Sequence, residues 1–536
     1  MRDRCRPKTK GHDIRHTGPH RHINGKLGYA NRDSLIARGS FLYLISRVLS
    51  ALLAYVGLLL LLTFLGSAVY GEISFALALS ATFNAFSDLG FGSAHIKRIS
   101  EGKDIDDCVS TYAAVKIVLT IVTVIVSVAA VTVWVLFLGG ELGGVTVSLV
   151  SLFILYQVFY NLSSIVTQTY FATMEQAKAQ IILLCDPFIR IPIIAIVLLG
   201  GMGAIQVAYV YVLTALAVLL VAVFFLRRDR IKWRKPALFS SYLSFALPLA
   251  IVAIIGALAS NMDKLFLGFF WDYNSVAYYT ASLTFTGIFG TIGAAVAVMT
   301  FPSFSKLHSE GRVDVIRTAT LQAERYVSII VMPMMTFIIV FPSEIARIFL
   351  GPGMETAGES MRYLAMVVLI NLINTAHSSQ ILAVNRPDLS AKLTLLNYGA
   401  FVVFLIMLVP KEVLGVALFG LSYVGAALAM LITSVIMFFV IRRVVHTLTG
   451  TGSNPKVMLH IVTASIAGLL VFLLSDIHAI DSLFVLIAYG LLTIGVFLGF
   501  LVLIKEFRRA DVLYFLDIIN ARKMWDYMTE EVRRSK

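Results

Sequence analysis

Long apolar runs follow one another along this chain, separated by short polar segments. A helix needs about 20 mostly apolar residues to cross the hydrocarbon core of a bilayer. The chain has 536 residues, 58% hydrophobic and 14% charged, more apolar surface than a water-soluble fold could bury. The sequence therefore predicts an all-α polytopic membrane protein with about fourteen spans. These are Phe41–Leu65, Ile73–Gly92, Ala113–Leu138, Val145–Tyr170, Ile181–Leu199, Ile205–Leu226, Phe245–Phe270, Val276–Thr300, Tyr326–Phe341, Leu364–Leu382, Leu393–Val409, Val416–Val440, Val457–Leu474 and Leu483–Ile504.

The basic residues are unevenly divided among the polar segments. If the N-terminus is cytoplasmic, only Arg347, Arg362 and Lys411 fall in outer segments. Four more lie within spans, so the other 37 of the 44 Lys and Arg lie on the cytoplasmic side. Cytoplasmic segments of membrane proteins carry such an excess, which reports topology rather than nucleic-acid binding. We therefore expect a multi-pass protein of the plasma membrane with both termini in the cytoplasm.

The longest charged run between spans is RRDRIKWRK (Arg227–Lys235), which separates six spans from eight. An ordinary positive-inside loop explains it, and so does a linker between two halves. A weak internal repeat supports the linker interpretation, because Phe64–Ala76 resembles Phe270–Ser282. These segments lie six spans apart, which predicts two halves of equal orientation.

Several sequence signatures of enzymes and metal sites are missing. The chain contains no GxxxxGK[ST], HExxH or GxSxG motif, and its three cysteines lack metal-ligand spacing. The longest outer loop, Pro342–Met361, is too short for a catalytic domain. The four histidines of the tail at 1–40 are interpreted as part of a solvated segment rather than a metal site. We therefore expect a secondary transporter without a cofactor or metal, and not an enzyme.

Charged residues within spans are functional candidates, because burying an unpaired charge in a bilayer is costly. Asp186 and Arg190 lie four residues apart in one span, so they share a helix face and could pair. Asp263 and Lys264 are neighbours in another span and need not pair. Arg47 lies about two turns inside the first span, where either snorkelling to the headgroups or a role in a cavity is consistent with its position.

Shallower and uncharged polar residues allow two interpretations. Lys116 lies near a span end and is expected to snorkel. Gln157 and Asn161 share one stripe of a span, and Asn374 and His377 share another. Interhelical hydrogen bonds and the lining of a hydrated cavity explain such stripes equally well.

The segment Arg32–Ser100 resembles the opening of O-antigen-type polysaccharide-biosynthesis flippases, members of the multidrug/oligosaccharidyl-lipid/polysaccharide superfamily. The shared features are a basic residue in the first span (Arg47), the turn Leu65-Gly66 with Tyr70-Gly71, and Asp88-Leu89-Gly90 before the basic pair Lys97-Arg98. NMDKLFLGFFWDYNSVAYYTAS, FPSFSKLHSEG, IARIFLGPG and YVGAALAMLITS follow in family order. The resemblance extends to about Val440.

This resemblance implies two six-helix lobes around a central cavity, at 41–226 and 245–440, joined by a linker at 227–244. Two peripheral helices (457–504) and a cytoplasmic tail (505–536) would follow. The implied substrate is a polyprenyl-phosphate- or pyrophosphate-linked saccharide, moved to the outer leaflet by alternating access, with glycosyltransferases or a polymerase as possible partners. The cavity candidates are Arg47, Asp88, Asp186, Arg190, Asp263, Lys264, Gln157, Asn161, Asn374 and His377. A drug or cation antiporter of the same superfamily and a non-transporting scaffold for glycan assembly are the alternatives.

Overall fold

The computed structural model describes residues 29–137, 143–476, 479–509 and 511–513 of the chain. Almost all of them lie in helices, as the apolar runs predict. The helices are α1 (Tyr29–Phe83), η1 (Asn84–Ser87), α2 (Phe91–Ser100), α3 (Ile105–Phe137), α4 (Gly144–Ala172), α5 (Gln176–Leu199), α6 (Ala204–Arg228), α7 (Phe239–Phe270), α8 (Tyr273–Ser309), α9 (Val313–Val340), α10 (Pro342–Leu350), α11 (Ala357–Ala383), α12 (Pro387–Leu408), α13 (Ser422–Thr449), α14 (Pro455–Ser475) and α15 (Leu483–Leu503). Two short strands, β1 (Glu412–Val413) and β2 (Val416–Ala417), join α12 to α13.

Thirteen helices in the described ranges are long and apolar enough to cross a membrane. The first of them, α1, is interrupted at Gly66, whose φ of 79° and ψ of 173° are not helical. A glycine tolerates this backbone conformation because it has no Cβ. The two arms of α1 correspond to the first two predicted spans, which brings the number of membrane-crossing segments to the predicted fourteen.

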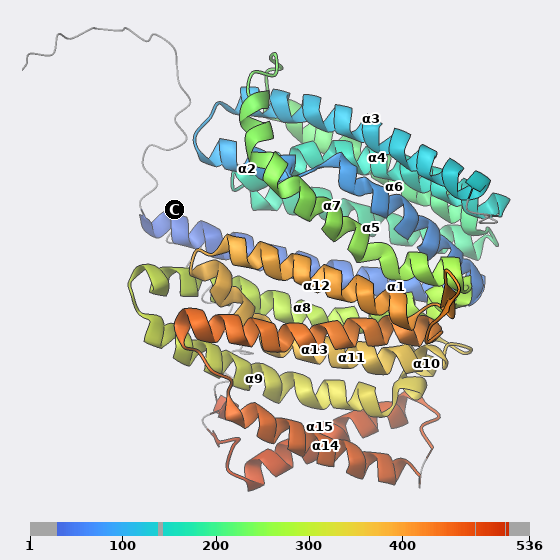
Figure 1. The fold of residues 1–536 in the computed structure, drawn as a ribbon, viewed down its shortest axis with the longest axis vertical. Coiled ribbons are helices and arrows are strands. Elements are labelled where there is room, and N and C mark those ends of the chain that lie inside the picture. Colours follow the sequence, from blue (N-terminus) through green and yellow to red (C-terminus); the bar gives the residue numbers. More distant parts are fainter. Residues whose placement is uncertain (1–28, 138–142, 477–478, 510, 514–536) are drawn as a thin grey trace, which may run out of the picture.

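Two groups of helices lie on either side of the first arm of α1 (Figure 1). One group contains α2 to α7, and the other contains α8 to α13, with α14 and α15 at its far edge. Contacts follow the same division: α4 packs on α6 in the first group, and α11 packs on α8 and α13 in the second. The most extensive contact of α1 is with α8, so α1 lies between the groups.

We call the end of the bundle that holds the α5–α6 and α12–α13 connections the outer end, following the predicted orientation. There α1 and α8 touch closely. The Ser67 hydroxyl donates to Oδ1 of Asn274 over 2.7 Å. A Cβ added to Gly71 would lie 1.7 Å from the carbonyl oxygen of Tyr273. Only glycine permits this approach, so the outer end is closed between the two groups.

Several boundaries differ from the predicted spans. The second span does not run to Gly92, because the helix gives way to η1 and the left-handed Gly90 before α2 begins. The twelfth does not begin at Val416, which lies in the β-hairpin. The short run around Pro333 is the apolar part of the longer α9. Apolar counting misplaces these ends because polar residues continue the helices and apolar residues occupy the hairpin.

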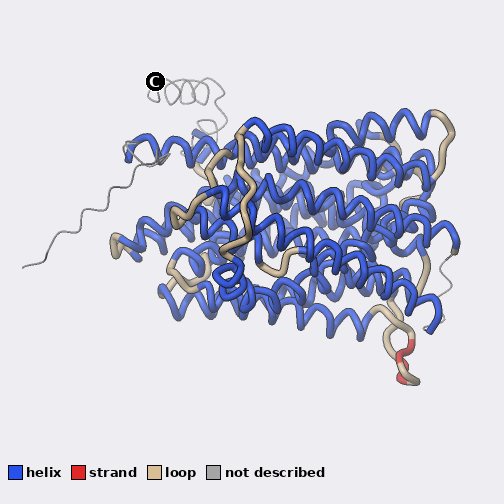
Figure 2. The backbone as a smooth tube through the Cα atoms, turned by 90° about the horizontal axis from the view of Figure 1, so that it is seen from above, coloured by secondary structure: helices blue, strands red, loops and turns tan. Residues whose placement is uncertain are grey.

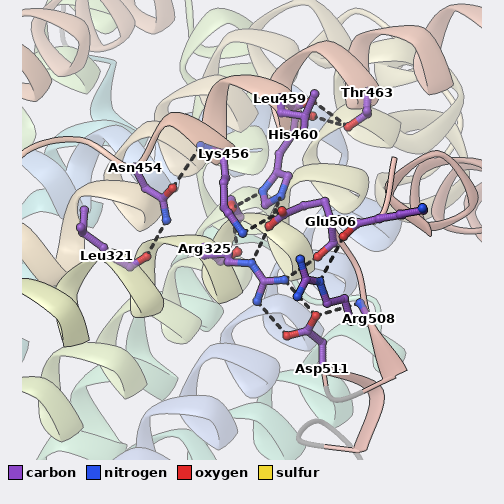
Figure 3. Close-up of polar contacts among 12 residues, drawn as sticks. Leu321, Arg325, Asn454, Lys456, Leu459, His460, Thr463, Glu506, Arg508 and Asp511 are labelled. Carbon is purple, nitrogen blue, oxygen red and sulfur yellow. Dashed lines mark hydrogen bonds and ion pairs between the residues drawn. The ribbon is translucent and has the colours of Figure 1, made fainter. Parts of the chain in front are cut away.

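The two peripheral helices are tied to the bundle by an ionic cluster (Figure 3). Arg325 of α9 contacts Glu506 at 2.6 Å and Asp511 at 2.8 Å, both in the segment after α15. Lys456 of α14 contacts the other oxygen of Glu506 at 2.8 Å. Hydrogen bonding to Arg325 lowers the pKa of Asp511 to about 2. The Arg325–Asp511 pair therefore stays charged at neutral pH and is lost only as the pH falls below about 4 towards 2.

We expect Arg325→Met to loosen the peripheral helices. The side chains of Arg325, Glu506 and Asp511 are only 12%, 8% and 9% exposed, and removing one member of a buried ion pair costs about 3–5 kcal/mol. Thermal unfolding in detergent measures the loss. Arg386 is the matched control, because its pair with Asp388 is 47% and 50% exposed and such surface pairs contribute about 0–1 kcal/mol. Equal melting temperatures for Arg325→Met and Arg386→Met would contradict this account.

The orientation of the bundle leads to a labelling prediction. Met202 is exposed in the α5–α6 turn, and Ser453 is exposed in the α13–α14 connection at the opposite end. In intact cells, a cysteine at Met202 should react with an impermeant thiol reagent, whereas one at Ser453 should not, because the charge bias places the latter inside. Reaction at Ser453 with protection at Met202 would reverse the orientation.

Two predicted tails lie largely outside the described residues. Residues 1–28 of the predicted tail at 1–40 are not described, and neither are residues 514–536 of the predicted C-terminal tail.

Candidate functional site

The pair predicted in the fifth span is present in α5. Nη2 of Arg190 lies 3.1 Å from Oδ2 of Asp186, one helical turn away. Thr214 of α6 also approaches Asp186, its hydroxyl 3.4 Å from Oδ1. Asp186 is thus contacted by side chains of both α5 and α6 within the helix bundle.

Three tyrosine rings pack in a row that begins at the guanidinium of Arg190. Its Cζ lies 4.4 Å from the ring centroid of Tyr211 on α6. Tyr156 of α4 packs between Tyr211 and Tyr160, with ring centroids 5.6 Å and 5.9 Å away. All three rings are partly exposed. Together with Arg190 and Asp186 they form what we call the Arg190 centre.

Part of the hydrogen-bonding capacity of Arg190 is unused. A guanidinium carries five N–H donors, and Nε of Arg190 is buried without a partner in the part of the chain that the structure describes. Its side chain keeps 16% of its surface exposed. One N–H donor of Arg190 is therefore buried beside the Asp186 pair without an acceptor among the described residues.

Arg47 of α1 adds a second cation near this centre. Its Nε donates to the hydroxyl of Tyr43 over 2.9 Å, and the side chain is exposed without a carboxylate partner in the described ranges. Tyr160 lies within electrostatic range of both Arg47 and Arg190. Two arginines and one aspartate give this region a net positive charge.

Asp263 and Lys264 of α7 face different neighbours. Asp263 is buried beside Tyr279 of α8. Lys264 lies one turn before Gly268, where an added Cβ would collide with Phe75 of α1, so Lys264 is on the face turned towards α1. Its Nζ is 3.9 Å from Oδ1 of Asp263, a long contact. The structure thus places Lys264 on the α7 face towards α1, and Lys264 does not contact Arg190 in the part of the chain that the structure describes.

Asp88 belongs to a separate polar network near the cytoplasmic end. It accepts hydrogen bonds from the backbone N–H of Gly92 and the hydroxyl of Tyr112, both 3.1 Å, and lies 3.6 Å from Nζ of Lys116. The expectation that Lys116 snorkels is wrong: its side chain is buried against Asp88. Asp88, in the connection between α1 and α2, supplies the ion-pair partner of Lys116. The apolar pattern of the sequence does not indicate this contact between distant segments.

The predicted polar stripe of α4 lies inside the first group of helices. Asn161 donates to Oδ1 of Asn84 over 2.6 Å and accepts from Ser87 over 3.1 Å. Gln157 and Asn161 line a small pocket with hydroxyls of α1 and α3, including Thr120. Both side chains therefore belong to a polar network between α1, η1, α3 and α4.

The stripe on α11 faces the α13–α14 connection. Nε2 of His377 lies 3.3 Å from the carbonyl oxygen of Gly452. Asn374 is buried, and its Oδ1 lacks a partner among the described residues. Both residues therefore lie within the second group of helices rather than at the Arg190 centre.

Sequence reasoning missed a buried ion pair and the tyrosines. Nη2 of Arg442 in α13 donates to Glu324 of α9 over 2.7 Å, with both side chains almost fully buried. Both residues lie beyond the predicted span ends, so the sequence placed them in cytoplasmic segments. The tyrosines of the Arg190 centre are amphipathic, so hydropathy does not distinguish them from other span residues. The one sequence signal for them is the spacing of Tyr156 and Tyr160, which places both rings on one face of α4.

Comparison with known proteins identifies one family and several relatives that match parts of the chain. The sequence pattern of the family described as "Polysaccharide biosynthesis protein" matches residues 36–308, just over half of the chain. An uncharacterized membrane protein of Methanocaldococcus jannaschii is 24% identical over 242 residues, 44% of this chain and 46% of that protein. The probable flippase AglR of Haloferax volcanii is 21% identical over 174 residues, 32% and 35% of the two chains. The matches span less than half of either relative.

Solved structures show the same fold. The structure of the lipid II flippase MurJ in an inward closed conformation aligns with a TM-score of 0.68 and 13% identity, covering 89% of this chain and 99% of that one. An inward-facing multidrug resistance MATE family transporter of the MOP superfamily aligns with a TM-score of 0.57 and 17% identity, covering 75% and 96%. At such identities the similarity concerns the fold, and it confirms the predicted all-α polytopic architecture.

Proposed function

Because this chain belongs to the polysaccharide biosynthesis protein family, we propose that it is a flippase for a polyprenyl-phosphate- or pyrophosphate-linked saccharide. It moves this substrate from the cytoplasmic to the outer leaflet of the plasma membrane and acts as a transporter rather than an enzyme. A sugar-phosphate headgroup cannot cross a hydrocarbon core of about 30 Å unaided, because its polar groups would be left without partners. The glycosyltransferases that build such substrates are the expected partners.

The observation that carries this proposal is the partly unsatisfied Arg190 in a tyrosine-lined, net positive region. Arginine binds phosphate through parallel N–H donors, and Nε of Arg190 lacks a partner in the described ranges. Tyr156, Tyr160 and Tyr211 supply flat faces and hydroxyls suited to a sugar. Arg47 adds charge from α1, and Lys264 adds charge from α7. We assign Asp88, Gln157, Asn161, Asn374 and His377 to packing networks within each half.

Alternating access fits the position of α1. The proposed lobes at 41–226 and 245–440 meet along α1 and α8, and their outer ends are closed at Gly71. Rocking of one lobe against the other would open this contact and expose the central cations to the outside. The polyprenyl tail would stay in lipid while the headgroup passes between the lobes.

A cationic-drug antiporter is the second candidate, because a multidrug resistance MATE family transporter has this fold. The charges near the Arg190 centre argue against it: Arg47 and Arg190 outweigh Asp186, so a cationic drug would meet net repulsion. A scaffold without transport would gain nothing from an arginine whose Nε–H, among the described residues, is left unpaired inside a span.

Ligand-dependent stabilisation tests the substrate class. A ligand at 100 times its Kd stabilises the folded state by about 2.7 kcal/mol. We expect a polyprenyl-pyrophosphate-linked sugar to raise the melting temperature of the purified protein, and the corresponding polyprenol, which lacks phosphate, to leave it unchanged. Stabilisation by a cationic amphiphile but not by the phosphorylated lipid would favour the antiporter.

A further inference from the structure

The β-hairpin between α12 and α13 extends away from the helices. β1 and β2 pair antiparallel with Val413 opposite Val416. The two turn residues, Leu414 and Gly415, have φ values of 52° and 81°. Figure 2 shows the hairpin in red at one end of the bundle, projecting sideways across the direction of the helices. It therefore lies level with the helix ends rather than above them.

The tip of this hairpin is apolar. Leu414 is 99% exposed, Val416 is 60% exposed and Phe419 is 65% exposed. Turns of this kind favour Asn-Gly, because a branched side chain is disfavoured at positive φ. Leu414 thus combines an unfavourable backbone conformation with full exposure of an apolar side chain, which indicates that something apolar covers it.

A tryptophan and a lysine lie together at the base of the hairpin. Nε1 of Trp271 donates to the carbonyl oxygen of Val409 over 2.8 Å, and Nζ of Lys411 lies 4.6 Å from the Trp271 ring centroid. Trp residues at helix ends sit at headgroup level, and lysines near the ends extend to it. Beside this pair, the backbone N–H of Phe419 donates to the carbonyl oxygen of Met407. Met407 is exposed on α12, so the hairpin continues an apolar helix surface.

We propose that the segment 411–421 is an interfacial anchor whose tip enters the lipid leaflet at the outer end of the bundle. Lipid is the occupant because the hairpin projects along the membrane plane, starts from a Trp–Lys interface pair and continues the exposed apolar surface of α12. An amphipathic element of this kind rests at the boundary between headgroups and acyl chains.

Spin-label accessibility in proteoliposomes tests this. With Cys5, Cys108 and Cys185 replaced by alanine, single nitroxides are placed by Leu414→Cys, by Val403→Cys on the exposed face of α12, and by Glu310→Cys in the α8–α9 turn. Oxygen concentrates in lipid, and a neutral nickel chelate stays in water. The oxygen-to-nickel ratio at Leu414 should approach that at Val403 and exceed that at Glu310 by about fivefold or more, because interfacial elements lie roughly 5–10 Å deep.

Two results would overturn the proposal. A ratio at Leu414 equal to that at Glu310 would show that the tip is in water. Spin–spin broadening at Leu414 that disappears on dilution with unlabelled protein would show that a second copy covers the tip instead. A cysteine at Leu414, nearly fully exposed, should not disturb folding, so either outcome can be interpreted.

Discussion

Arg190→Gln combined with Asp186→Asn is expected to lower the rate of glycolipid translocation by at least about 100-fold, because two charge-assisted hydrogen bonds to phosphate, each about 1.5–3 kcal/mol, are lost. Changing both residues keeps the pair neutral and similar in volume, so Asp186 is not left as a lone buried charge. The amount of protein in the membrane should stay normal. Translocation of a fluorescent glycolipid in proteoliposomes measures the loss.

Further variants separate phosphate binding from a structural role. Arg190→Lys keeps the charge but loses the parallel donors, so its rate should fall between wild type and the double variant. If the pair were only structural, the double variant would transport normally once folded, and that result would contradict the account. Lys264→Ala should also reduce transport strongly. Arg47→Ala should have a weaker effect, because Arg47 is exposed and free to reach the headgroups.

Gly71→Ala is expected to open the outer end of the protein. Its Cβ would lie 1.7 Å from the Tyr273 carbonyl oxygen and 3.2 Å from the Ala277 nitrogen, both backbone atoms that cannot rotate away. The α1 and α8 backbones must therefore separate by more than about 1 Å, because interfaces in close-packed interiors leave no spare room. If each transport cycle requires the outer end to close, transport should slow by about 10-fold or more. This corresponds to destabilising the closed state by roughly 1.4 kcal/mol.

Thiol labelling reports this opening directly. A cysteine at Ser67, on the α1 side of the contact, should react faster with an impermeant reagent from outside in the Gly71→Ala background. Gly57→Ala on the same helix is the control, because its Cβ would meet only Cδ1 of Ile191, the end of a flexible side chain. Unchanged labelling in Gly71→Ala would mean that α1 and α8 separate without exposing the outer end, contrary to the rocking proposal.

Much of the architecture can be predicted from the sequence, because lipid imposes a simple rule. Backbone groups in hydrocarbon need internal partners, so each long apolar run becomes a helix. The Asp186–Arg190 pair could be predicted in the same way, because four-residue spacing within one helix fixes which side chains meet. Both inferences need only local information.

Contacts between distant segments could not be predicted. Lys116 pairs with Asp88 and Arg442 pairs with Glu324, and each pair depends on how separate helices pack. The hairpin at 412–417 contains enough apolar residues to imitate the start of a span, so apolar counting placed Val416 inside the membrane. The tyrosines beside Arg190 come from two helices, and only the fold brings Tyr156 and Tyr211 together.

The proposed activity of the protein is the movement of a phosphate-linked glycolipid across a bilayer. The most direct test reconstitutes the protein with a polyprenyl-pyrophosphate sugar that carries a fluorophore, and adds an impermeant quencher outside. Protein-free liposomes should lose about half of the fluorescence, because the headgroup cannot cross alone. Wild-type proteoliposomes should lose nearly all of it, and those with the Asp186→Asn/Arg190→Gln variant only about half. Wild-type quenching that stops at half, in vesicles that transport a cationic drug, would contradict the account.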